Sequence, residues 1–136
     1  MRSFTTPPSL EEMVALADEA LAWAQARFPR DLARLLSGVS IVVDDFPDDE
    51  TVEEMGLASG WDLTGLWRGV PLTRRSVTDV PREPEIIHFY RLPILAEWIE
   101  TEVDLRALVR NVLVHEIAHH FGFSDEEIAR LEADGG

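Results

Sequence analysis

The strongest structural signal in the chain is an apolar pattern near its C-terminus, over about residues 102–121. There the apolar residues recur every three or four positions, which is the spacing of one face of a helix. The residues of this stripe are Leu105, Leu108, Val109, Val112 and Leu113. With Thr101 as a candidate cap, the pattern predicts a long helix whose apolar face packs against a core supplied by the preceding residues.

The last turns of this predicted helix carry His115, Glu116 and His119 in the order H-E-x-x-H. Two histidines four residues apart project from one helix face, so their ring nitrogens can converge on a single tetrahedral cation. Glu116 lies about 100° around the helix from His115 and can reach a metal-bound water without becoming a ligand. A favourable interaction with the helix dipole explains one histidine at a helix end, but not two with a glutamate between them. The spacing therefore indicates a zinc site with Glu116 as its general base.

A catalytic zinc usually takes three protein ligands, so the sequence must supply one more. Gly122 allows a sharp turn after the helix, and Asp125, three residues further on, is the first choice. Ser124 and Glu127 also form a capping-box pattern, which places Asp125 in the first turn of a final helix, where acids are common. Glu126 or a water could complete the site instead, and the sequence leaves these alternatives open.

Composition limits both the metal ligands and the partners. The chain has 136 residues, 46% of them hydrophobic, which fits a single domain over residues 1–136 with one core. It has no cysteine, so any metal must be held by imidazole and carboxylate groups. The net charge is -14 and all twelve basic residues are arginine, which argues against nucleic acid and anionic membranes as partners. Since no signal peptide or long apolar run is present, we expect a soluble, cytoplasmic protein.

Earlier segments predict the remaining elements. Ser9 and Glu12 form a capping box before a helix over about residues 10–28. Strand patterns occupy three further segments, at residues 39–43, 63–70 and 85–92. The acid-rich residues 44–54 are expected to form a solvated loop.

Residues 115–125 read H-E-x-x-H-x-x-G-x-x-D, which resembles the extended zincin pattern in which the last position, often histidine, is aspartate in some members. More closely, the chain is similar to the small bacterial family of zincin-like minimal metallopeptidases. Two segments carry the likeness, Gly65-Leu66-Trp67-Arg68-Gly69-Val70-Pro71-Leu72 and residues 114–122. The likeness covers most of residues 30–130, and the metal motif is its specific part.

The resemblance implies an α+β fold, with a small mixed or antiparallel sheet packed against helices and the metal motif on the long C-terminal helix. It also implies that His115 and His119 are zinc ligands, Glu116 the base and Asp125 the third ligand. The expected activity is that of a zinc-dependent metallopeptidase, which cleaves peptide or protein substrates by Glu-assisted attack of a metal-bound water. The alternative is a zincin-like metal-binding scaffold or regulatory protein with little or no turnover. One departure from larger zincins is that no methionine follows Met55 to form a turn beneath the metal, so the floor of the site must come from upstream.

Three other residues are secondary candidates. His120 points about 100° away from the neighbouring His119 and is expected at the surface or behind the ligands. His88 and Tyr90 share one face of a strand that, in a zincin, could run above the metal helix and hold an extended substrate. Tyr90 is the only tyrosine, and thus the only phenol available to stabilise an oxyanion.

Overall fold

The computed structural model describes residues 6–68, 85–122, 126 and 129–130. Within this part of the chain, the strands form a mixed three-stranded sheet with the order β1-β3-β2. The central strand β3 (Glu85–Tyr90) runs parallel to β1 (Val39–Asp44) and antiparallel to β2 (Gly65–Arg68). In the described sheet, β1 and β2 are therefore the edge strands.

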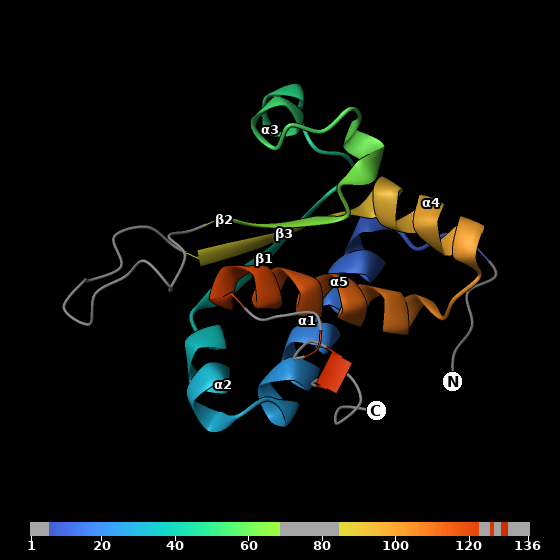
Figure 1. The fold of residues 1–136 in the computed structure, drawn as a ribbon. Coiled ribbons are helices and arrows are strands. Elements are labelled where there is room, and N and C mark those ends of the chain that lie inside the picture. The colour runs from blue at the N-terminus through green and yellow to red at the C-terminus, as the bar shows by residue number, and fades with distance from the viewer. Residues whose placement is uncertain (1–5, 69–84, 123–125, 127–128, 131–136) are drawn as a thin grey trace.

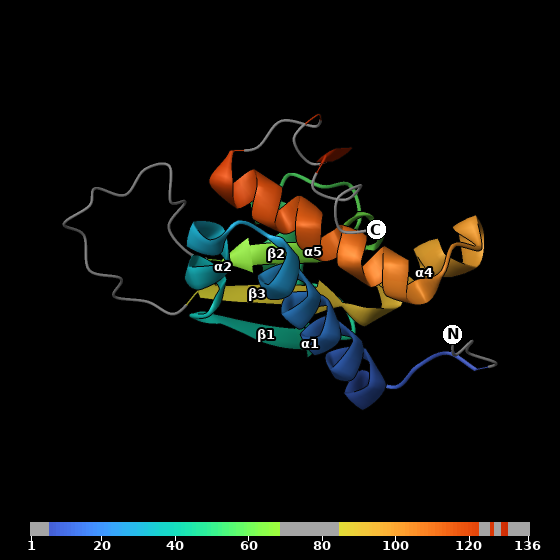
Figure 2. The ribbon, with the colours of Figure 1, turned by 90° about the horizontal axis from the view of Figure 1, so that it is seen from below.

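One face of this sheet is covered by helices. Figure 1 shows α1 (Leu10–Arg27), α2 (Arg30–Leu36) and α5 (Leu105–Phe121) on one side and the short α3 (Asp49–Glu54) on the other. From below, α1 and α5 are seen to cross the strands (Figure 2). The fold is α+β, with a small mixed sheet packed against helices and the H-E-x-x-H motif on a long helix near the C-terminus, as the sequence led us to expect.

The hydrophobic core lies between the sheet and the long helices. Ile87 and Phe89 of β3 are fully buried in one cluster with Met13 of α1 and Ile117 of α5. Because side chains alternate across a strand, Ile86, His88 and Tyr90 of β3 face the opposite side of the sheet, which carries α3. We call the face that carries Ile87 and Phe89 the inner face of the sheet, and the face that carries α3 the outer face.

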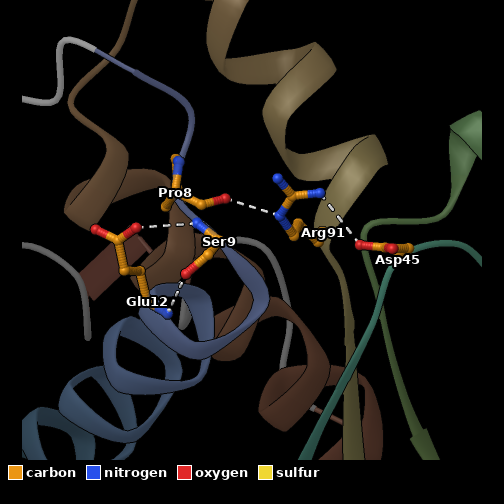
Figure 3. Close-up of polar contacts among 5 residues, drawn as sticks. All are labelled: Pro8, Ser9, Glu12, Asp45 and Arg91. Carbon is orange, nitrogen blue, oxygen red and sulfur yellow. Dashed lines mark hydrogen bonds and ion pairs between the residues drawn. The ribbon is translucent and has the colours of Figure 1, made fainter.

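The N-terminal segment is fixed to the rest of the fold by Arg91, as Figure 3 shows. The Arg91 Nε donates to the Pro8 carbonyl at 2.7 Å, and its Nη1 lies 3.2 Å from Asp45 Oδ1. Immediately after Pro8, Ser9 and Glu12 form the expected capping box at the start of α1. Arg91 thus connects the entry to α1 with the loop that follows β1.

The helix α4 (Arg91–Thr101) was not predicted. The predicted strand over residues 85–92 ends at Tyr90 because Arg91 already belongs to this helix. Pro93 is the third residue of α4, where a backbone N–H has no acceptor within the helix, so the missing hydrogen bond costs nothing there.

The long helix starts later than expected, at Leu105. Its cap is Asp104, whose carboxylate accepts from Ala107 N at 3.0 Å. Thr101, the predicted cap, instead ends α4, and its hydroxyl donates to the Glu97 carbonyl at 2.7 Å.

The acid-rich segment after β1 also differs from the prediction, because it contains α3. Asp48 caps this helix by accepting from Thr51 N at 2.7 Å. A helix with four acids among its six residues gives only a weak apolar pattern, and its cap is the main sequence signal. None of the helices in the described ranges is long and apolar enough to cross a membrane.

Candidate metal centre

His115 and His119 lie on one face of α5, in its last two turns. Their ring centroids are 6.5 Å apart and the rings are inclined at 73°. A zinc ion bound by both rings needs centroids about 5 Å apart, so rotation of the side chains has to close the remaining gap of about 1.5 Å. The two imidazoles therefore fit zinc in donor type and lie on the same helix face, and their side chains would have to rotate toward each other to share one ion.

The third ligand is not fixed by the structure. Asp125, the first choice from the sequence, lies outside the described residues. Glu126 is described, and its carboxylate is 86% exposed and lies 3.8 Å from Arg130. No group of three potential metal ligands is found among the residues that the structure describes, so the placement of Asp125 stays a prediction.

Glu116 is held beside the histidines by the edge strand β2. Its Oε1 accepts from the backbone N–H of Trp67 at 3.0 Å, and its Oε2 lies 4.0 Å from His119 Nδ1. The side chain is only 17% exposed. Burial raises the pKa of the Glu116 carboxyl above its ordinary value of 4.5, while the Trp67 hydrogen bond and His119 oppose this rise. A carboxylate in this setting can accept a proton more readily than one in water.

The close approach of β2 to α5 requires a glycine at position 65. A Cβ at Gly65 would lie 2.7 Å from Val112 Cγ1 and 3.5 Å from Glu116 Cγ. Tyr90 N donates to the Thr64 carbonyl, so every second residue from Thr64 onward faces β3, whereas Gly65 and Trp67 direct their backbone groups away from it. This alternation is why Trp67 N is available to Glu116.

A buried cluster behind the motif fixes Trp67. Its indole stacks on the His120 ring with centroids 4.0 Å apart and planes inclined by 3°. The indole N–H donates to Glu85 Oε2 at 2.7 Å, and His120 Nε2 lies 3.9 Å from the same oxygen. The side chain of His120 is 4% exposed. Of the two positions expected for it, at the surface or behind the ligands, the surface one is therefore excluded.

The sequence did not indicate this cluster. Trp67 and Glu116 are 49 residues apart, and no local pattern predicts such a contact. The one available signal was the likeness of residues 65–72 to a recurring segment of the zincin-like family.

His88 and Tyr90 are on the same face of β3, as predicted, but that face is the outer one. The strand that lies against α5 beside the motif is β2, and the inner face of β3 presents Ile87 and Phe89. The proposed contact of His88 and Tyr90 with a substrate above the metal helix is therefore wrong for this arrangement, because the sheet separates them from α5.

The comparison with protein families agrees with this geometry. A family model described as zincin-like metallopeptidase matches residues 36–135, which begin at the last residue of α2. The chain belongs to the zincin-like metallopeptidase family. The comparison with curated proteins found no match. The family match includes β2, α5 and every residue that the sequence nominates for the zincin-like metal site.

Proposed function

We propose that the chain is a zinc-dependent peptidase in which His115, His119 and Asp125 hold the metal and Glu116 is the general base. The observation that carries the proposal is the position of Glu116. Its carboxylate is largely buried, lies beside His119, and is anchored at one oxygen by the Trp67 N–H.

The chemistry follows from these positions. Zinc, when bound, would polarise a peptide carbonyl and lower the pKa of a water molecule. Glu116 Oε2, the oxygen not bonded to Trp67, would accept the proton of that water and later deliver it to the leaving amine. Trp67 N would hold the carboxylate in one orientation throughout both transfers.

The open side of β2 supports a peptide substrate. Gly65 directs its backbone groups away from β3, as does the carbonyl of Trp67, and an extended chain can pair with such groups at the edge of a sheet. The net charge of -14 supports a substrate other than nucleic acid.

The test compares Glu116→Gln with the parent chain on a broad peptide library, with zinc content measured by elemental analysis. We expect Glu116→Gln to retain zinc and to cleave about 100- to 10,000-fold more slowly, because a general base contributes a factor of this size. His115→Ala should lose zinc. Glu100→Gln, which makes the same chemical change at an exposed position on α4, is the control and should retain both zinc and cleavage.

Two results would contradict the proposal. Full cleavage by Glu116→Gln would remove Glu116 as the base, and equal zinc in His115→Ala would remove the metal site. If the parent chain binds zinc and cleaves no member of the library, the metal-binding scaffold is the better description.

A further inference from the structure

A cavity lies on the outer face of the sheet, the face opposite α5. It has a volume of about 520 Å³ and is bounded by the ends of β1 and β3 and by α3. Its lining includes Asp44, Phe46, Asp48, Arg68, His88 and Tyr90. Its volume is in the range of small-molecule sites, which is about 300–1,000 Å³.

Two polar side chains in this lining make no hydrogen bond through their ring nitrogen or hydroxyl within the described residues. His88 Nδ1 is buried and has no hydrogen-bond partner there. Tyr90 is 3% exposed, and its hydroxyl takes part in none of the hydrogen bonds among those residues. Buried polar atoms in folded proteins are normally hydrogen-bonded, so His88 Nδ1 indicates a missing ligand or solvent. The Tyr90 hydroxyl is available to the same ligand or solvent.

The distance between His88 and Asp44 fits a shared donor. His88 Nδ1 lies 3.7 Å from Asp44 Oδ2, which is too long for a direct hydrogen bond. An ammonium group can lie about 2.9 Å from both atoms at once. A neutral imidazole accepts at one of its nitrogens, so the pair can act as two acceptors for one cationic group.

The charge of the lining favours a cation. Arg68 is the one basic residue among the described lining residues, and its guanidinium is already engaged with α3, through Thr51 Oγ1 at 2.7 Å and Glu54 Oε2 at 3.5 Å. The hydrogen bonds from Thr51 hold the pKa of Asp48 below its ordinary value, so this carboxylate stays ionised. Asp44 and Asp48 therefore leave the cavity negative.

Aromatic rings favour an organic cation over a bare metal ion. The rings of His88 and Tyr90 stack with centroids 6.2 Å apart, and Phe46 adds a third ring to the wall. Such rings attract cations and cover apolar groups. The described residues contain no group of three His, Asp or Glu side chains placed to hold a metal.

We propose that the outer-face cavity binds small organic ammonium ions, with the ammonium group between Asp44 and His88 and the carbon chain against Tyr90. This site is separate from the peptidase centre and does not depend on the proposed activity.

Tyr90 provides a specific reporter, because it is the only tyrosine in the chain. The full chain, labelled with isotopic tyrosine, would be titrated with pentylammonium and observed by NMR. We expect a saturable shift of the Tyr90 ring signals. 1-Pentanol and pentanoate, which have the same chain length without the positive charge, should cause no saturable shift.

Variants connect the signal with the cavity. Asp44→Asn should weaken pentylammonium binding about tenfold or more, because a charge-assisted hydrogen bond is lost. Asp18→Asn makes the same chemical change at an exposed site on α1 and should bind like the parent chain. Retained dispersion of the other NMR signals would show that each variant is folded.

The proposal is overturned if pentylammonium gives no saturable shift, if 1-pentanol gives the same one, or if Asp44→Asn binds with unchanged affinity. A saturable shift with Ca²⁺ or Mg²⁺ but not with pentylammonium would also overturn it and would identify a metal site.

Discussion

At the scale of single residues, the adjacent histidines at the end of α5 show how position on a helix separates two roles. The His119 side chain is 73% exposed and lies beside Glu116, whereas that of His120 is 4% exposed and stacks on Trp67. Successive residues point about 100° apart on a helix. The same residue type is thus presented to the site at one position and to the core at the next.

This difference gives a paired prediction. His120→Ala should lower the free energy of unfolding of the metal-free chain by about 2–4 kcal/mol, because it leaves a cavity against the Trp67 indole. His119→Ala should change it by no more than about 0.5 kcal/mol, as is usual for an exposed position.

Zinc affinity should respond in the opposite order. Because His119 is a proposed ligand, His119→Ala should weaken zinc binding more than about 100-fold. His120→Ala, where it is folded, should still bind zinc. Denaturant titration and zinc titration of both variants measure the two effects, and equal losses of stability would contradict the assignment of His120 to the core.

At the scale of elements, the contact between β2 and α5 decides the position of Glu116. Because Gly65 lets the strand pass close to Val112, Trp67 N comes within hydrogen-bond distance of the Glu116 carboxylate. The strand orients the Glu116 carboxylate, and the helix supplies it.

We therefore expect Gly65→Ala to destabilise the chain by about 1–3 kcal/mol, as overpacking of a tight contact does. It should also reduce cleavage, since β2 must move away from α5. Gly38→Ala is the matched control, because a Cβ there meets nothing within 4 Å. Thermal unfolding and peptidase assays of both variants provide the measurements. Equal stability of the two variants would show that β2 is not constrained at Gly65.

The elements that the sequence predicted are those with strong local patterns. The capping box at Ser9 and the apolar spacing that follows gave α1, and the β-branched residues 39–43 gave β1. The helix α4 was missed because Pro93 was taken as the end of a strand, although a proline is equally suited to the first turn of a helix.

For the site, the motif placed His115, Glu116 and His119 correctly on one helix, because their spacing is itself a helical property. It could not place Trp67 against Glu116, since that contact depends on how β2 pairs with β3 and packs on α5. It also could not separate the two faces of β3. His88 and Tyr90, which were secondary candidates for a place above the metal helix, lie instead on the outer face.

At the scale of the whole molecule, the position of Glu116 reduces overall stability. Its pKa is raised by burial, so the ionised carboxylate is less favourable in the folded chain than in the unfolded one. The folded state therefore binds the Glu116 proton more tightly than the unfolded state does. The protonated Glu116 carries no such penalty, so the free energy of unfolding is highest, as far as this group is concerned, at pH values below about 4.5. This stability is lost as the pH rises through the folded-state pKa of Glu116.

Glu116→Gln should consequently stabilise the metal-free chain at pH 7, relative to the parent, and this gain should shrink as the pH falls toward 4. The amide oxygen of the glutamine can still accept from Trp67 N. The measurement is denaturant unfolding with a chelator at several pH values. Glu100→Gln, at an exposed position on α4, controls for the loss of one negative charge. A gain that is equal in both variants, or that grows on acidification, would contradict the prediction.

The hydrogen bond between Glu116 and Trp67 also concerns the open edge of β2. A strand edge with unoccupied amides is a template on which another chain can add and begin to aggregate. In the resting protein, the Glu116 carboxylate occupies the Trp67 amide on the open side of β2. One side chain thus leaves this edge with one amide fewer on which another chain could add.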